Sequence, residues 1–208
     1  MSELDLAGWL SRLEQLHPTE IELGLDRVSS VAHRLGLLEP ACPVVTVAGT
    51  NGKGSTIAVL DQILRSSGKR TGVYTSPHLF KYNERICIDG EMATDTALVD
   101  SFCRIDKARQ EISLTYFEFS TLAALDLFQR SELDVVLLEV GLGGRLDAAN
   151  IIDPDIAIIT SIALDHEGWL GNDRETIALE KAGILRKGGQ FVCADLDPCV
   201  SLASRAVE

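Results

Sequence analysis

The sequence predicts an α/β fold built on a mostly parallel sheet with helices on both faces. Two observations predict it. Short runs of Val, Ile, Leu and Ala alternate with longer stretches whose apolar residues recur at helical spacing. The short runs are apolar on both faces, which is typical of parallel strands covered by helices on both sides. Ligands of such folds bind beside the carboxyl ends of the strands, so the chemistry of this protein is expected there.

Helices are predicted where apolar residues recur every three or four positions: residues 4–16, 25–35, 55–67, 94–111, 117–130 and 174–185. Strands are predicted at the short aliphatic runs: residues 44–48, 72–75, 134–140, 156–162 and 191–194. Residues 85–92 read as a short surface hairpin that turns at Asp89 and Gly90, because this pair adopts the positive φ angles of tight hairpins.

The strand predicted at 44–48 runs into the sequence GTNGKGST at residues 49–56. Glycines let backbone N–H groups turn toward an anion, the following helix adds the positive end of its dipole, and Lys53 adds a mobile charge. We therefore predict a nucleotide triphosphate site in a P-loop NTPase-like fold. The loop is a variant, because Val47 and Gly54 stand where the usual spacing has Gly and Ser or Thr. A plain strand–helix connection is the alternative, which the ordered succession of strand, loop, lysine, hydroxyls and helix disfavours.

Composition bounds the class of protein. With 208 residues and 46% hydrophobic content, the chain can bury the core of one large domain or of one domain with a small appendage. Its formal net charge of −12, without clustered Lys or Arg, argues against a nucleic-acid partner. Anionic ligands must then be met locally, by the glycine loop, its lysine and a divalent cation.

The sequence also favours a cytoplasmic location. No apolar run reaches membrane-spanning length, which argues against a membrane partner, and the N-terminus is acidic where a signal peptide would be basic and then apolar. The five cysteines are odd in number and lack C-x-x-C spacing, so we expect reduced thiols in the core: Cys42, Cys87, Cys103, Cys193 and Cys199.

Polar residues follow two of the aliphatic strands. Glu139 closes the strand at 134–140, where a carboxylate is costly unless it binds something, and opposite a phosphate loop we expect that to be Mg²⁺. The alternative is that Glu139 turns to solvent or pairs with Arg145. His166 follows the strand at 156–162. A lone histidine is more often a hydrogen-bonded structural residue, but its position after a third strand of one sheet favours a metal ligand.

Several motifs together carry a family resemblance: GTNGKGS at 49–55, TSPHL at 75–79, NERI at 83–86, EVGLGGRLD at 139–147, DH at 165–166, LG at 170–171 and EKAGI at 180–184. Spread in order over nearly the whole chain, they resemble the folylpolyglutamate synthase family of the Mur ligase superfamily. Within it, the motifs are most similar to those of bacterial bifunctional dihydrofolate synthase/folylpolyglutamate synthases. The resemblance implies the Mur ligase central domain type of fold.

The resemblance implies an ATP-dependent ligase that joins a pterin-bearing carboxylate, dihydropteroate or folate, to the amine of L-glutamate through an acyl phosphate. It implies that the ATP phosphates are held by Thr50, Asn51, Gly52, Lys53, Gly54 and Ser55. It implies that Mg²⁺ is held by Ser76, Glu139 and His166, and that the residues with catalytic roles are Lys53, Lys181 and His166. We expect small-molecule partners and a monomer.

Lys181 is a special case. In the family, the matching lysine is often carbamylated, and a carbamate forms on a neutral amine and turns a cation into an anion. From the sequence alone, a helix-surface lysine that pairs with Glu180 or Glu175 is favoured, and the resemblance reverses that preference.

The resemblance also implies a pterin pocket that includes the N-terminal segment and the loop at 76–85. Its substrate-binding residues would be Thr115, Tyr116, Phe117, Glu118, Leu146, Asp147 and Ala148. An aromatic ring can stack on the flat pterin and Asp147 can bond its amino groups. Equally, Phe117 and Phe119 fit simple helix packing, and Asp147 fits a loop cap.

Members of this family are about twice as long, so we expect residues 1–208 to be an incomplete ATP-binding domain without the C-terminal glutamate ligase domain. We expect this part alone not to form the amide. The other candidates are a plain P-loop NTPase or switch, a cell-wall Mur ligase, and a non-catalytic fragment that binds nucleotide or pterin.

Overall fold

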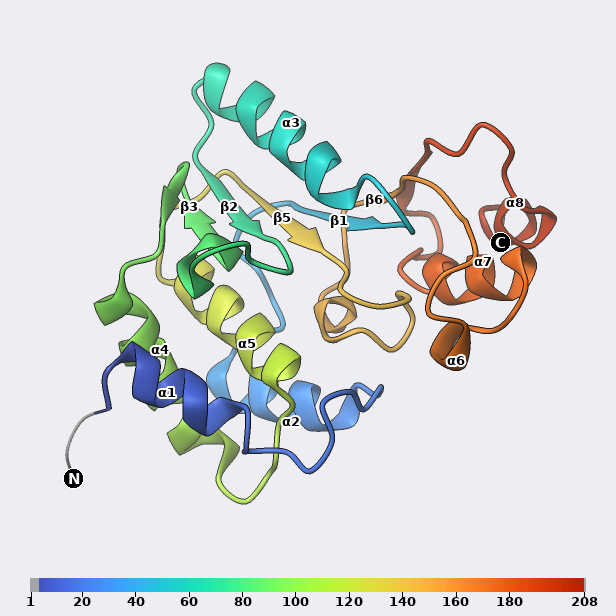
Figure 1. Cartoon of the computed structure of the whole chain (residues 1–208). Helices are drawn as coiled ribbons and strands as arrows, with labels where there is room; N and C mark the ends of the chain where they lie inside the picture. Colours follow the sequence, from blue (N-terminus) through green and yellow to red (C-terminus); the bar gives the residue numbers. More distant parts are fainter. Residues whose placement is uncertain (1–3, 208) are drawn as a thin grey trace.

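A mixed sheet of seven strands forms the centre of the molecule (Figure 1). The computed structural model describes residues 4–207. The strands are β1 (Val44–Ala48), β2 (Thr71–Tyr74), β3 (Ile86–Ile88), β4 (Glu91–Met92), β5 (Val135–Glu139), β6 (Ile156–Ile159) and β7 (Gln190–Cys193). They lie in the order β4-β3-β2-β5-β1-β6-β7, in which β2, β5, β1, β6 and β7 are parallel and β3 and β4 antiparallel. The predicted mostly parallel sheet is confirmed.

Helices cover both faces of this sheet, as predicted. They are α1 (Leu6–Leu13), α2 (Asp26–Leu35), α3 (Lys53–Ser66), α4 (Asp95–Arg109), α5 (Tyr116–Gln129), α6 (Glu167–Leu170), α7 (Arg174–Ala182) and α8 (Val200–Arg205). Two short 3₁₀ helices, η1 (Tyr82–Arg85) and η2 (Ala148–Ile151), complete the described part. The sequence did not predict α6 and α8, because helices of four and six residues are too short to display a helical period.

Successive side chains of β1 point to opposite faces of the sheet and so belong to different core clusters. Val45 and Val47 pack with Ile57 of α3 on one face, whereas Val44 joins the larger cluster formed with α1, α2, α4 and α5. The residues of α7 and α8 form a third cluster with Ile159 of β6, on the face opposite α3. Figure 1 shows α3 alone on one side of the sheet and the other long helices on the opposite side.

The predicted hairpin is present, with positive φ angles of 53° at Asp89 and 80° at Gly90. It is not a separate surface feature, because β3 pairs with β2 and so extends the main sheet. The expectation that all cysteines are core is wrong for Cys103, which is exposed, while Cys199 is buried.

Parallel strands bring the segments that follow them to one edge of the sheet. The central strand β1 lies between β5 and β6, and β2 lies beside β5. The glycine loop after β1, Ser76 beyond β2, Glu139 at the end of β5 and the residues after β6 therefore meet at this edge.

Candidate active site

The glycine loop after β1 is built so that a side chain at Gly49 cannot fit. A Cβ at Gly49, whose φ is +149°, would lie 1.8 Å from the hydroxyl oxygen of Thr160. That hydroxyl donates to the carbonyl oxygen of Asn51 at 2.7 Å, and Gly52 has a φ of +83°. The loop thus lies directly against the end of β6, and its shape leaves a backbone cradle at the start of α3, which fits phosphate groups.

Lys53 is the first residue of α3, two positions earlier than the predicted start of that helix. Its Nζ donates to the carbonyl oxygens of Gly49 and Thr50 at 3.0 and 3.3 Å. The ammonium therefore folds back over the loop, where the phosphates of a nucleotide would lie. A triphosphate offers this ammonium stronger, charged acceptors than two carbonyl groups do.

Glu139 faces the start of α3. Its carboxylate accepts a hydrogen bond of 3.1 Å from the backbone N–H of Ser76, and a Cβ at Gly54 would lie 3.7 Å from one of its oxygens. Burial raises the pKa of this carboxyl, while the Ser76 N–H and Lys53 act in the opposite direction. Glu139 is 5% exposed and Arg145 pairs with Glu180 at 2.8 Å, so the alternative of a solvent-facing or Arg145-paired carboxylate is wrong.

His166 has a left-handed backbone conformation, with a φ of 48°, immediately before α6. Its ring is half-exposed and lies 3.7 Å from the Asp165 carboxylate. His166 and Ser76 line the same cavity, and Ser76 in turn contacts Glu139. Within residues 4–207, His, Cys, Asp and Glu side chains form no group of three able to hold a metal ion. A cation held by Ser76, Glu139 and His166 would thus be completed by substrate or water oxygens, as Mg²⁺ sites commonly are.

Lys181 is buried on α7, so the alternative of a surface lysine is wrong. The carboxylates expected as its surface partners are occupied elsewhere: Glu180 pairs with Arg145, and Glu175 accepts from the backbone of Ser201. Burial, followed by the charge of Lys53, lowers the pKa of Lys181 to about 8. Asp165 and Asp147 raise the pKa by a smaller amount. The structure thus brings Lys181 within electrostatic range of the glycine-loop lysine.

A cavity of about 740 Å³ adjoins this edge of the sheet. It is lined by all seven residues predicted to bind substrate: Thr115, Tyr116, Phe117, Glu118, Leu146, Asp147 and Ala148. Ser76, His166 and the N-terminal segment at 17–24 also line it. Its volume and its mixture of aromatic and polar walls suit an organic ligand with a flat ring.

Asp147 is both a cap and a wall of the cavity. Its carboxylate accepts from the backbone N–H groups of Ala149 at 2.9 Å, at the start of η2, and of Leu142 at 2.8 Å. Burial raises the pKa of this carboxyl to about 6, against the effect of these hydrogen bonds. The cap proposed as an alternative is therefore present, and it does not remove Asp147 from the cavity.

The residues at the start of α5 have structural partners of their own. Thr115 and Glu118 form a capping box, and the Glu118 carboxylate also accepts from Arg27 of α2 at 3.1 Å. The Phe117 ring lies 5.9 Å from that of Tyr74, so Phe117 packs as the helix-packing alternative expects, and it also lines the cavity. Phe119 is fully buried in the core, also as that alternative expects.

Tyr116 lies at the cavity wall beside a buried cation. Its ring lies 5.4 Å from the Arg85 guanidinium carbon, and Arg85 also lies over Tyr82 and donates to His78 Nδ1 at 2.8 Å. The sequence predicted no individual role for Arg85 or His78. Their signal was only their place in the TSPHL and NERI motifs.

Sequence reasoning also missed the polar residues that follow β6. The backbone N–H of Thr50 donates to the carbonyl oxygen of Ser161 at 2.8 Å, and the hydroxyl of Thr160 contacts Asn51. Thr160 and Ser161 could have been found, because these two polar residues interrupt an aliphatic run. The predicted strand at 156–162 included them, whereas β6 ends at Ile159.

Comparisons with known proteins show which family the chain resembles. Residues 47–204 match the family model described as Mur ligase middle domain. A dihydrofolate synthase/folylpolyglutamate synthase of Escherichia coli strain K12 is 60% identical over 203 residues, which are 98% of this chain and 48% of that protein. The structure of E. coli FolC in complex with DHPP and ADP matches with a TM-score of 0.96 at 55% identity, over 98% of this chain and 49% of that one.

A second solved structure, a bifunctional folylpolyglutamate synthase/dihydrofolate synthase with Mn, AMPPNP and L-glutamate bound, has a TM-score of 0.92 at 56% identity. It too is covered over 49% of its length by 98% of this chain. The chain thus spans about half the length of the curated relatives it matches. Among residues 4–207, no helix combines the length and the apolar character needed to cross a bilayer.

Proposed function

The chain belongs to the Mur ligase family, whose middle domain it carries, and we propose that it supplies the ATP site of a ligase that joins dihydropteroate or folate to L-glutamate. One observation carries the proposal. Glu139 contacts Ser76, which lines the cavity, and faces the first turn of the helix that follows the glycine loop. A phosphate site and a pocket for a ring compound thus share one edge of the sheet, as the transfer of a phosphoryl group between their ligands requires.

In the proposed reaction, a carboxylate oxygen of the pterin substrate attacks the γ-phosphorus of ATP. ADP leaves with the electron pair of the broken P–O bond, which gives an acyl phosphate. The amino group of L-glutamate attacks the acyl carbon and loses a proton, and inorganic phosphate leaves with the C–O bond electrons. Positioning and charge neutralisation supply most of the rate in such transfers, so no protein nucleophile is needed.

Within this scheme, the residues at 50–55 hold the phosphates, and Lys53 exchanges its carbonyl partners for phosphate oxygens. Ser76, Glu139 and His166 hold Mg²⁺, which when bound offsets phosphate charge. In support, the hydrogen bond from Ser76 N–H holds the Glu139 carboxylate, and the charge of Lys53 acts on it. The cavity holds the pterin, with Asp147 facing its amino groups and Tyr116 or Phe117 beside its ring. We place the reaction in the cytoplasm.

Lys181 is proposed to carry a carbamate, formed when its neutral amine adds CO₂ and releases a proton. The lowered pKa of about 8 supports this, because it leaves about a tenth of the amine neutral at pH 7, far more than an ordinary lysine has. Carbon-13 NMR of the protein in ¹³C-bicarbonate checks it. A carbamate signal that is absent from K181A is expected, and a wild-type spectrum without that signal would contradict it.

The proposed activity can be tested in a chimera in which this chain replaces the matching half of the E. coli relative. With ATP, Mg²⁺, dihydropteroate and labelled glutamate, we expect amide product, and at least a tenfold lower kcat in the Lys53→Ala chimera, since the ammonium serves the phosphates. UDP-muramoyl peptide in place of dihydropteroate as the carboxylate substrate should give no product. A folded chimera that turns over only with UDP-muramoyl peptide, or whose kcat is unchanged by K53A, would overturn the proposal.

A further inference from the structure

The segment at 161–163, which follows β6, holds the glycine loop by five hydrogen bonds. The carbonyl oxygen of Ser161 accepts from the backbone N–H of Thr50 at 2.8 Å. The Ser161 hydroxyl accepts from the N–H of Asn51 and donates to the carbonyl oxygen of Asn51, at 3.2 Å each. The Thr50 hydroxyl accepts from Ala163 N–H at 3.0 Å and donates to Ala163 carbonyl at 3.2 Å. We call residues 161–163 the brace. Two of the six residues proposed to hold phosphate are thus placed by the brace.

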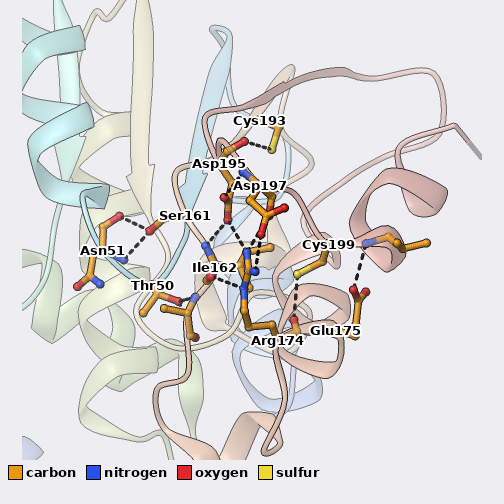
Figure 2. Close-up of polar contacts among 12 residues, drawn as sticks. Thr50, Asn51, Ser161, Ile162, Arg174, Glu175, Cys193, Asp195, Asp197 and Cys199 are labelled. Atoms are coloured by element: carbon orange, nitrogen blue, oxygen red, sulfur yellow. Dashed lines mark hydrogen bonds and ion pairs between the residues drawn. The ribbon is translucent and has the colours of Figure 1, made fainter.

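The brace is itself held from outside the nucleotide site (Figure 2). Its middle residue, Ile162, donates its N–H to the Asp195 carboxylate at 2.8 Å and accepts at its carbonyl from Arg174 Nε at 3.0 Å. Asp195 and Arg174 also lie 3.5 Å apart as an ion pair. Figure 2 shows the two side chains converging on Ile162, on the side away from Thr50 and Asn51.

Arg174 and Asp195 come from two different elements. Arg174 is the first residue of α7, the helix that carries Lys181, and Asp195 follows β7. By bonding the Ile162 carbonyl, Arg174 also closes the base of the loop at 162–174, on which His166 lies. The pair therefore fixes the positions of the brace, of α7 and of the base of the His166 loop relative to one another.

We propose that Asp195 and Arg174 are positioning residues for the nucleotide site: they hold the brace, and the brace holds Thr50 and Asn51 in the shape that receives phosphate. Neither side chain is bonded to the glycine loop itself. Preorganised donors favour binding because no ordering cost is left to meet when the ligand arrives. The inference deepens the proposed function, on which it rests for the identity of the ligand as ADP or ATP.

The chain offers a matched control in Asp197. Its side chain is 90% exposed and accepts from Arg174 at 3.1 Å, but it does not bond Ile162. Asp195, in contrast, is 11% exposed. Changing Asp197 to Ala removes one carboxylate and one Arg174 contact near the same place, and it leaves both bonds to the brace intact.

Titration calorimetry with Mg²⁺–ADP and residues 1–208 tests the proposal. We expect D195A to weaken ADP binding at least fivefold, D197A to change it less than twofold, and D195N to lie between them, because an amide oxygen can still accept from Ile162 N–H. In a double-mutant cycle with Thr50→Val, the fold-loss of ADP affinity in the double mutant should be smaller than the product of the losses in D195A and T50V, because both changes act through the brace. Equal affinities of D195A and D197A, or strictly multiplicative effects in the cycle, would overturn the proposal.

Hydrogen exchange without any ligand gives an independent readout. In D195A, the amides of Thr50 and Asn51 should exchange at least fivefold faster, while those of β2 remain unchanged. Unchanged exchange at Thr50 and Asn51 would refute the role of Asp195. If D195A fails to fold, ADP affinity and the amide exchange of Thr50 and Asn51 are measured in D195N and R174K instead. If wild-type protein binds no ADP but its loop amides still respond to D195A, the proposed function fails and the positioning role stands.

Discussion

At the scale of single residues, burial of ionisable groups defines the candidate site. Glu139, Asp147 and Lys181 are all nearly inaccessible to solvent. Burial favours the neutral form of each, so it raises the pKa of the two carboxyl groups and lowers the pKa of Lys181. Glu139 lies at the end of β5 beside the glycine loop, Asp147 lines the cavity, and Lys181 interacts electrostatically with Lys53 and Asp147. Perturbed groups gathered at one place favour a functional site over a set of unrelated structural residues.

Substitution of Glu139 by Gln tests the metal assignment. The amide oxygen of Gln can still accept from Ser76 N–H, so the fold should be kept, but the charge that attracts Mg²⁺ is lost. We expect ATP affinity in the presence of Mg²⁺ to fall about tenfold and metal-free ATP affinity to change less than twofold. Equal losses with and without Mg²⁺, measured by calorimetry, would show that Glu139 is not a ligand.

Asp147 predicts a pH dependence of stability. Because its pKa is raised to about 6, the folded state binds more protons than the unfolded state between about pH 4 and 6. The free energy of unfolding should therefore fall as pH rises through this window, by about 2 kcal/mol from this one group. In Asp147→Asn that contribution is absent, so the stability of D147N relative to wild type should rise from pH 4 to 7. Urea unfolding at several pH values checks this, and a constant difference would contradict it.

At the scale of elements, local chemistry decides where helices begin. Asp173 precedes α7 and its carboxylate accepts from Thr176 N–H at 2.8 Å, while Thr115 and Glu118 cap α5. Such caps are visible in the sequence, and predicted boundaries there fall within one residue of the observed ones. The start of α3 was misplaced by two residues, because the glycine loop enters the helix directly at Lys53 instead of through a side-chain cap.

Removal of the α5 cap should affect both stability and substrate. Thr115→Ala leaves Glu118 N–H without its side-chain acceptor, which should lower the free energy of unfolding by about 1 kcal/mol. Because Thr115 lines the cavity, pteroate affinity should fall as well. Thr94→Ala, which removes the corresponding cap of α4 outside the cavity lining, should lower stability alone. If T115A and T94A leave pteroate affinity equally unchanged, Thr115 does not contribute to the pocket.

At the scale of the molecule, the order of the strands assembles a site from segments far apart in the sequence. Aliphatic runs and helical periods were enough to predict the parallel sheet and its covering helices. Because ligands bind beside the carboxyl ends of parallel strands, Glu139 could also be placed at the correct edge. They could not give the burial of Lys181, because it depends on how α7 packs against the loop at 141–145. Nor could they give the contact that holds the brace, since Asp195 and Ile162 are brought together only by the pairing of β6 with β7.

The most direct test of the central claim is the position of a Mn²⁺ ion in a crystal of residues 1–208 grown with AMPPNP. Mn²⁺ substitutes for Mg²⁺ and is located by its anomalous scattering. We predict one strong peak within coordination distance of Ser76 and Glu139, with the AMPPNP phosphates on the loop at 49–55 and His166 turned toward the metal. Phosphates elsewhere, or a metal peak away from Glu139 while AMPPNP occupies the loop, would contradict it.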